Sequence, residues 1–456
     1  MKPLNQIADD QTAASTSPGL PDDRVDTIAN LKSIDVSPVS DTPSSTSKPK
    51  LTTRMLRRGV LNRFSKLTNG LLLVTEGDIE HRFGDESVDD SLVAKITIHS
   101  PEFFRRVAIG GSLGFAESFI FGEWTSDSPT NVVRMFCRNL RVTDAGNSGI
   151  VRLVTKLARK WHERQNNSKD GSARNIHAHY DLGNDFYSLF LDETMTYSSG
   201  VFETPESTLH EAQIAKIDRL CRKLDLKQSD HLVEIGTGWG GMAIHAAKNY
   251  GCKVTTTTIS KEQHDFACRR VAKEGLGDRI TLLLEDYRDL QGSFDKLVSV
   301  EMIEAVGYEY FDTFFTKCGS LLKPDGQMAI QGITMSEQRY PNYLKSVDFI
   351  QRYIFPGGCL ITPKAVLDSV ARTTDMRLLH VEDLAPHYGR TVRLWRERFF
   401  EKIEQVRLQG FPETFIRLWD FYLSYCEAAF EERLVGTVQM QFAKPRCMSD
   451  ALRPFV

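Results

Sequence analysis

The chain has 456 residues, a length typical of two or three domains. Apolar residues make up 41% and charged residues 26%, as in ordinary globular proteins, and the net charge of -3 argues against a dedicated nucleic-acid binder. No uncharged apolar run is long enough for a transmembrane helix, the N-terminus lacks a signal-peptide pattern, and the eight cysteines form no CxxC pair. We therefore expect a cytoplasmic enzyme with reduced thiols and without a zinc ribbon or disulfide framework.

Composition divides the chain into a tail and two domains. Residues 1–50 hold 13 serines and threonines and six prolines but no aromatic residue, so they cannot bury enough apolar surface to fold and are predicted to be a disordered tail. A polar run over 166–175 marks a linker. We expect a smaller α+β domain over 51–165, with strands at 70–75 and 94–98, and a larger domain over 176–456.

Two segments of the smaller domain combine a helical spacing of apolar residues with an excess of cations. Residues 51–66 carry five arginines and lysines and no acid, and residues 151–164 carry five against the single acid Glu163. Basic amphipathic helices suit an anionic membrane surface. A second interpretation stays open, in which each helix packs on its own domain and exposes its basic face to water.

The sharpest local motif is a glycine-rich turn that follows an apolar strand at 231–235. Gly236, Gly238 and Gly240 are spaced GxGxG and lead into a helix, so the backbone can approach a ligand closely at the helix N-terminus. A dinucleotide site would have GxGxxG and an acid about twenty residues on, but the next strand, 253–259, ends without an acid. Strands and helices go on alternating through 294–300 and 327–331, which predicts an α/β fold with a doubly wound, mostly parallel sheet.

A series of further motifs in one order points to a family. They lie at 179–186, 195–198, 287–290, 353–360 and 387–391 with Trp395, and in the smaller domain at 96–104 and 111–118. Together they resemble the cyclopropane fatty acid synthase family, which includes the mycolic acid cyclopropane synthases. The resemblance covers about residues 60–445. It implies the S-adenosylmethionine methyltransferase type of sheet, preceded by a lipid-docking domain.

The resemblance also implies the reaction, in which S-adenosylmethionine methylates a cis double bond in an acyl chain of a membrane phospholipid. It assigns donor contacts to Tyr180, Tyr197, Ser198, Gly236, Thr237, Gly238, Trp239, Gly240, Gly241, Thr258, Ile259, Gln263, Asp286, Tyr287 and Arg288. Backbone amides of the glycine turn suit the donor's polar groups, and side-chain hydroxyls and amides can replace an acidic ribose ligand. The ring of Tyr287 offers a face for the adenine.

Methyl transfer leaves a carbocation on the acyl chain, and a base must then remove a proton. In the cyclopropane synthases the resemblance implies a bound bicarbonate as the base, held by a Cys, a Glu, a His and a Tyr. Glu304 and Tyr388 match this set, whereas Ser199 stands for the cysteine and Gln331 for the histidine. Glutamine lacks the positive charge that histidine can carry. Bicarbonate therefore stays an open expectation, with Glu304 as the nearest alternative base.

The altered base site favours the branch of the family that forms an exocyclic methylene, the precursor of a 10-methyl-branched fatty acid that a separate reductase saturates. A cyclopropane ring is the second prediction, and a lipid-binding protein without catalysis is the third. Lipid-domain motifs and balanced charge disfavour methylation of RNA or of a small molecule. We expect peripheral association with the inner face of the cell membrane and leave a homodimer open.

Two smaller signals receive structural interpretations. Cys426 matches a family cysteine that is sometimes assigned as a nucleophile, but methyl transfer to an alkene needs no thiolate, so we interpret it as a core residue. His177 and His179 have HxH spacing without a partner cluster, so no metal is expected.

Overall fold

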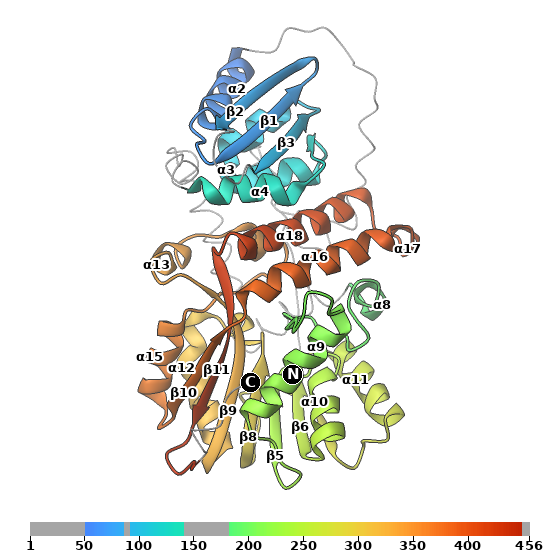
Figure 1. The fold of residues 1–456 in the computed structure, drawn as a ribbon, viewed down its shortest axis with the longest axis vertical. Helices are drawn as coiled ribbons and strands as arrows, with labels where there is room; N and C mark the ends of the chain where they lie inside the picture. The colour runs from blue at the N-terminus through green and yellow to red at the C-terminus, as the bar shows by residue number, and fades with distance from the viewer. Residues whose placement is uncertain (1–50, 86–91, 141–181, 449–456) are drawn as a thin grey trace, which may run out of the picture.

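The computed structural model describes residues 51–85, 92–140 and 182–448 (Figure 1). The predictions for the tail 1–50, the basic segment 151–164, the linker 166–175, Tyr180 and the pair His177 and His179 lie outside these residues. No helix within the described ranges is both long and apolar enough to cross a membrane.

The N-terminal part is a four-stranded sheet covered by helices. Its elements are α2 (Leu51–Phe64), β1 (Gly70–Glu76), β2 (Ile79–Asp85), β3 (Val93–Ile98), α3 (Glu102–Ile120), β4 (Trp124–Thr125) and α4 (Pro129–Arg138). The strand order is β2-β1-β3-β4, with β1 parallel to β3 and antiparallel to β2. Sequence patterns predicted β1 and β3 but missed β2, because most of its side chains are solvent-exposed and so show no apolar run.

Helix α2 packs its apolar side on its own domain. Val60 and Phe64 are buried in the core, and the Phe64 ring lies 5.9 Å from that of Phe136 in α4. The cations Arg54 and Arg58 lie on the exposed side. The structure thus favours the second interpretation of this segment: most of its apolar side chains pack on its own domain, with Met55 exposed, and its basic face is open to a partner.

The larger part is a seven-stranded α/β sheet, which confirms the predicted fold class. Its elements are α8 (Asn184–Tyr187), α9 (Leu209–Lys223), β5 (His231–Ile235), α10 (Gly241–His245), η1 (Ala246–Tyr250), β6 (Lys253–Thr258), α11 (Lys261–Lys273), β7 (Ile280–Leu284), β8 (Phe294–Val300), η2 (Ile303–Ala305), η3 (Tyr308–Tyr310), α12 (Phe311–Leu321), β9 (Leu322–Met335), α13 (Tyr340–Tyr343), α14 (Phe349–Tyr353), α15 (Pro363–Thr373), β10 (Arg377–Asp383), α16 (Ala385–Glu401), α17 (Ile403–Leu408), α18 (Glu413–Glu431) and β11 (Val435–Ala443). The strand order is β10-β11-β9-β8-β5-β6-β7; β11 pairs antiparallel with both β10 and β9, and the other pairs are parallel.

Helices α16 and α18 lie between the two sheets (Figure 1). Helix α18 packs on α3 and α4, where Thr130 donates a hydrogen bond to Glu427 at 2.9 Å and Arg134 pairs with Glu432 at 2.8 Å. One hydrophobic cluster runs from α2 through α18, so the two parts share a core.

Helix α3 bends at Gly111, inside the motif that the sequence pointed to at 111–118. Its backbone angles, φ 58° and ψ -129°, lie far from helical values and are accessible to glycine at little cost. The bend places Gly111 and its neighbours on the wall of the cavity described next.

Candidate active site

A cavity of about 1140 Å³ runs between the two parts of the molecule. It begins at the glycine turn after β5 and passes Glu301, which directly follows β8. It continues to Gly111 of α3 and Phe136 of α4. The site therefore lies at the carboxyl ends of parallel strands, where ligands of open α/β sheets bind.

Most of the residues expected to touch the donor line one end of this cavity. They are Tyr197, Ser198, Gly236, Thr237, Gly238, Trp239, Gly241, Thr258, Ile259, Gln263, Asp286, Tyr287 and Arg288. Gly240 is not among the lining residues; it is the N-cap of α10, with φ of 86°. Tyr180 lies outside the described residues.

The shape of this end fits a ligand that touches backbone. Gly238 has φ of 52°, and a Cβ built on it would meet no atom within 4 Å. Polar partners surround the turn, since Thr258 donates to Gln263 at 3.1 Å and Asp286 pairs with Arg288 at 2.8 Å. The glycine turn, the hydroxyl and amide pair and the Tyr287 ring fit the polar and aromatic parts of S-adenosylmethionine.

A buried cation that sequence reasoning missed lies beside these residues. Lys216 of α9 is 1% exposed and donates a hydrogen bond of 2.6 Å to the Ser198 hydroxyl. Burial lowers its pKa to about 8, so the ammonium form prevails at neutral pH. A lysine within the apolar stripe of the segment that forms α9 was the available signal. Its charge suits the carboxylate of the donor's amino-acid moiety.

The centre of the cavity contains a second missed residue, Glu301. Its carboxylate accepts hydrogen bonds from the Tyr388 hydroxyl at 2.5 Å, from Gln331 Nε2 at 2.8 Å and from the Ser199 backbone N–H at 3.1 Å. These are three of the four residues that the resemblance implied for bicarbonate. Ser199 and Gln331 are not among the residues that line the cavity. The Ser199 hydroxyl donates to the Gly200 carbonyl, and Gln331 Nε2 donates to Glu301.

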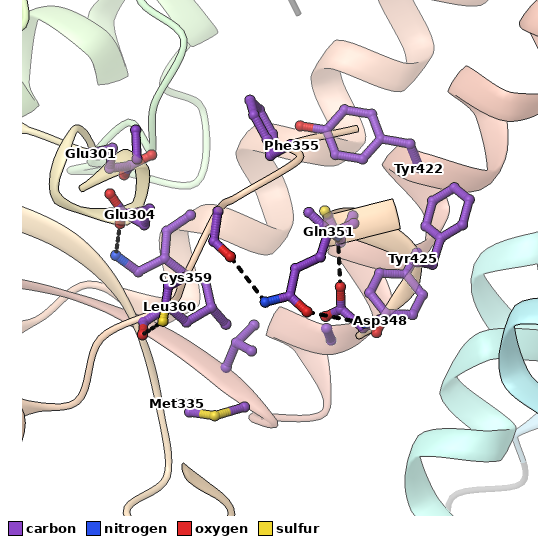
Figure 2. A pocket seen from close by; sticks show the side chains of 18 of the residues that line it. Glu301, Glu304, Met335, Asp348, Gln351, Phe355, Cys359, Leu360, Tyr422 and Tyr425 are labelled. Carbon is purple, nitrogen blue, oxygen red and sulfur yellow. Dashed lines mark hydrogen bonds between the residues drawn. The ribbon is translucent and has the colours of Figure 1, made fainter. Parts of the chain in front are cut away.

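Glu304, the fourth residue of that set, lies next to Glu301 on the cavity wall (Figure 2). One of its oxygens accepts a hydrogen bond from the Ile333 backbone N–H, and the other is buried without a hydrogen-bond partner in the described part of the chain. Burial and then the Glu301 charge raise its pKa to about 8. Glu304 is therefore mainly protonated at neutral pH. Burial also raises the pKa of Glu301, but the hydrogen bonds from Tyr388 and Gln331 oppose this effect and favour its ionised form, so Glu301 is better placed to act as a base.

Aromatic side chains line the cavity together with the two carboxyl groups. The Tyr197 and Tyr422 hydroxyls are 2.7 Å apart, and the Tyr197 ring lies 5.2 Å from that of Trp395. Tyr388 stacks on Phe430 at 4.2 Å, and burial together with Glu301 raises its pKa well above the usual range. Such faces stabilise a nearby cation.

Cys426 also lines the cavity. Burial raises the pKa of its thiol far above the usual range, and the charge of Asp348 adds to this effect. The thiol is therefore protonated at neutral pH, which argues against its use as a nucleophile.

Comparison with known proteins places these observations in a family. The family described as Mycolic acid cyclopropane synthetase matches residues 167–440. Tuberculostearic acid methyltransferase UfaA1 of Mycobacterium tuberculosis is 40% identical over 77% of this chain and 83% of its own, and the cyclopropane-fatty-acyl-phospholipid synthase of Escherichia coli is 34% identical over 78% and 90%. The solved structure of mycolic acid cyclopropane synthase CmaA1 complexed with SAH and CTAB is 32% identical with a TM-score of 0.56, covering 60% of this chain and 98% of that one.

Proposed function

Because the chain belongs to the mycolic acid cyclopropane synthetase family and is an S-adenosylmethionine-dependent methyltransferase of lipid acyl chains, we propose that its product is an exocyclic methylene. The substrate is a cis double bond in an acyl chain of a phospholipid. A separate reductase would then saturate the methylene to a methyl branch.

The Glu301 carboxylate carries this proposal. It accepts hydrogen bonds from the Tyr388 hydroxyl, from Gln331 Nε2 and from the Ser199 backbone N–H, which belong to three of the four residues that the resemblance assigns to bicarbonate, so the proposed base is part of the chain. Bicarbonate would have to compete with a carboxylate that is tethered in place. The residues present therefore do not fit a bound bicarbonate, and no step depends on one.

The steps follow from where the charge develops. The π electrons of the alkene attack the methyl carbon of the sulfonium and form the new C–C bond, while the S–CH3 bond breaks and its electron pair stays on sulfur to give S-adenosylhomocysteine. This leaves a cation on the other alkene carbon. A hydride moves from the methylated carbon to that cation, so the charge comes to rest beside the new methyl group. Glu301 removes a proton from the methyl group, and the C–H electrons form the exocyclic double bond.

The choice between methylene and ring depends on when the proton leaves. If the proton leaves before the hydride shift, the electrons close a cyclopropane. The hydrogen bonds from Tyr388 and Gln331 hold the Glu301 carboxylate and oppose the rise of its pKa that burial causes. They limit the driving force for early proton removal, which gives the hydride time to move. The aromatic wall meanwhile protects the cation.

We further propose that the enzyme works on the inner face of the cell membrane, attached to its surface. The exposed cations of α2 provide the attraction, and the part of the cavity between α3 and α4 receives the acyl chain. The apolar side chains there, such as Phe115, Val133 and Phe136, suit a hydrocarbon.

Incubation of an oleoyl phospholipid with the enzyme and S-adenosylmethionine tests the product. Methylene and ring products have the same mass, so proton NMR of the released fatty acid is the measurement: vinylic signals are expected, whereas a ring gives strongly upfield signals. A spectrum with ring signals alone would overturn the proposed product. Glu301→Gln is expected to lose most turnover while it retains donor affinity.

A further inference from the structure

A row of buried polar side chains leads away from Glu301 across three strands. Gln331 on β9 lies opposite Gln439 on β11, and Gln439 lies opposite Glu382 on β10. Both glutamines are fully buried. Lys223, the last residue of α9, inserts its ammonium between Gln439 and Glu382.

Each hydrogen bond of this row has a defined donor and acceptor. Lys223 Nζ donates to Gln439 Oε1 at 2.6 Å, Gln439 Nε2 donates to Gln331 Oε1 at 2.9 Å, and Gln331 Nε2 donates to Glu301 at 2.8 Å. A glutamine amide can bind either way round, because one end accepts and the other donates. A protonated lysine can only donate. It therefore fixes the orientation of the first amide, and the first amide fixes the second.

We propose that Lys223 is a positioning residue that acts through Gln439 to keep the N–H end of Gln331 turned toward Glu301. The inference rests on the proposed function, in which Glu301 is the base. With the amide reversed, an oxygen would face the carboxylate, and Glu301 would take up a proton at a pH where the reaction needs it ionised.

The surroundings hold Lys223 in its donating form and place. Its Nζ lies 2.5 Å from Glu382, which also pairs with Arg219. Gln441 donates a hydrogen bond to the Lys223 backbone carbonyl. Burial lowers the pKa of Lys223 to about 8 against the opposing effect of Glu382, so the ammonium prevails at neutral pH.

Gln439→Glu should exchange donor and acceptor in the hydrogen bond between residues 439 and 331. Glutamate and glutamine have nearly the same shape, so the packing changes little. A carboxylate at 439 still accepts from Lys223 but has no hydrogen to donate, so Gln331 must turn its N–H toward residue 439 and its oxygen toward Glu301. We expect the acid limb of the pH profile of turnover to move upward by about one unit, with donor affinity unchanged. At a pH below the limb, this is about a tenfold loss of turnover.

Gln327→Glu is the matched control. Gln327 is a buried residue of the same strand as Gln331, and its Oε1 also accepts from a lysine, Lys296, at 3.2 Å. Its Nε2 contacts Cys447 and not the row.

Other charged and titratable groups surround the row. Those that face Glu301 are Tyr388 of α16, Lys216 of α9 and Glu304 of η2. Those around Lys223 and residue 439 are Glu382, Arg219 and His380. Both variants leave all of them in place.

The proposal requires that the acid limb of the pH profile of turnover shifts upward in Gln439→Glu and is unchanged in Gln327→Glu. An unchanged acid limb in Gln439→Glu, or an equal shift in both variants, overturns the proposal. Glu301→Gln, measured in parallel, distinguishes failure of the proposed base Glu301 from failure of the positioning role of Lys223. If Glu301→Gln is inactive while Gln439→Glu keeps its limb, the positioning role alone fails; full activity of Glu301→Gln removes the proposed base.

Discussion

Glu301 combines an unfavourable backbone with a well-bound side chain. Its φ of 49° lies in the left-handed region, which costs a non-glycine residue about 1–2 kcal/mol, and the strain sits at the centre of the cavity. A strained residue held by three hydrogen bonds is typical of a functional position. Removal of its side chain should therefore relieve strain and leave the donors of Tyr388 and Gln331 without an acceptor.

We predict that Glu301→Gly is inactive alone and regains turnover when bicarbonate is added. Glycine accepts the backbone angle, and the vacated donors would bind a small anion that replaces the missing base. Glu301→Gln is the control, because its amide fills the same space and should show no rescue. Turnover measured against bicarbonate concentration gives the answer, and equal curves for the two variants would contradict the anion-site interpretation.

Glu304 should make stability depend on pH. Its folded-state pKa of about 8 is above the usual 4.5, so it stabilises the fold below pH 4.5 and loses that contribution as the pH rises toward 8. The change is roughly 1.4 kcal/mol per pH unit within this window. We predict that Glu304→Gln, measured by denaturant unfolding between pH 5 and 8, shows a shallower fall than the wild type. Parallel curves would exclude Glu304 as the titrating group.

At the scale of elements, the turn between β5 and α10 should bind the donor through its backbone. Gly238→Val places a side chain in space that is open in this structure, so we predict at least a tenfold loss of affinity for S-adenosylmethionine in calorimetry, with the fold retained. Gly275→Val is the control: Gly275 also has a positive φ, and its Cβ would also meet no atom within 4 Å, but it does not line the cavity. Comparable donor binding by both variants would remove the turn from the donor site.

Patterns along the chain predicted the elements better than the chemistry they bring together. The strand expected at 294–300 matches β8 at both ends, because its central residues are apolar and buried in a parallel sheet. Strand β2 has no such buried residues. Glu301 was missed, although it lies only three residues before Glu304, because the pairing of β8 with β9 is what places it in front of Gln331. Contacts that depend on strand register and on a rare backbone angle leave no periodic signal.

At the scale of the whole molecule, attachment to a membrane should be electrostatic. We predict that the protein sediments with anionic vesicles and that binding weakens as salt rises, since charge attraction is screened over about 8 Å at physiological ionic strength. The double variant Arg54→Ala/Arg58→Ala on the exposed side of α2 should bind less. Lys261→Ala/Lys364→Ala, which removes two exposed cations from the larger part, should bind as the wild type does. Equal binding to neutral and anionic vesicles would contradict this mode of attachment.

The shared cavity has a chemical consequence beyond the recognition of lipid. A carbocation that meets water is captured as an alcohol. Any water that enters the cavity would therefore convert part of the product into a hydroxylated acyl chain, which is heavier than the methylene product by one water molecule. Because α3 and α4 complete the cavity wall, we expect the N-terminal part to seal the site against hydration. The yield of alcohol is therefore a direct gauge of how tightly the two parts of the molecule close over the substrate.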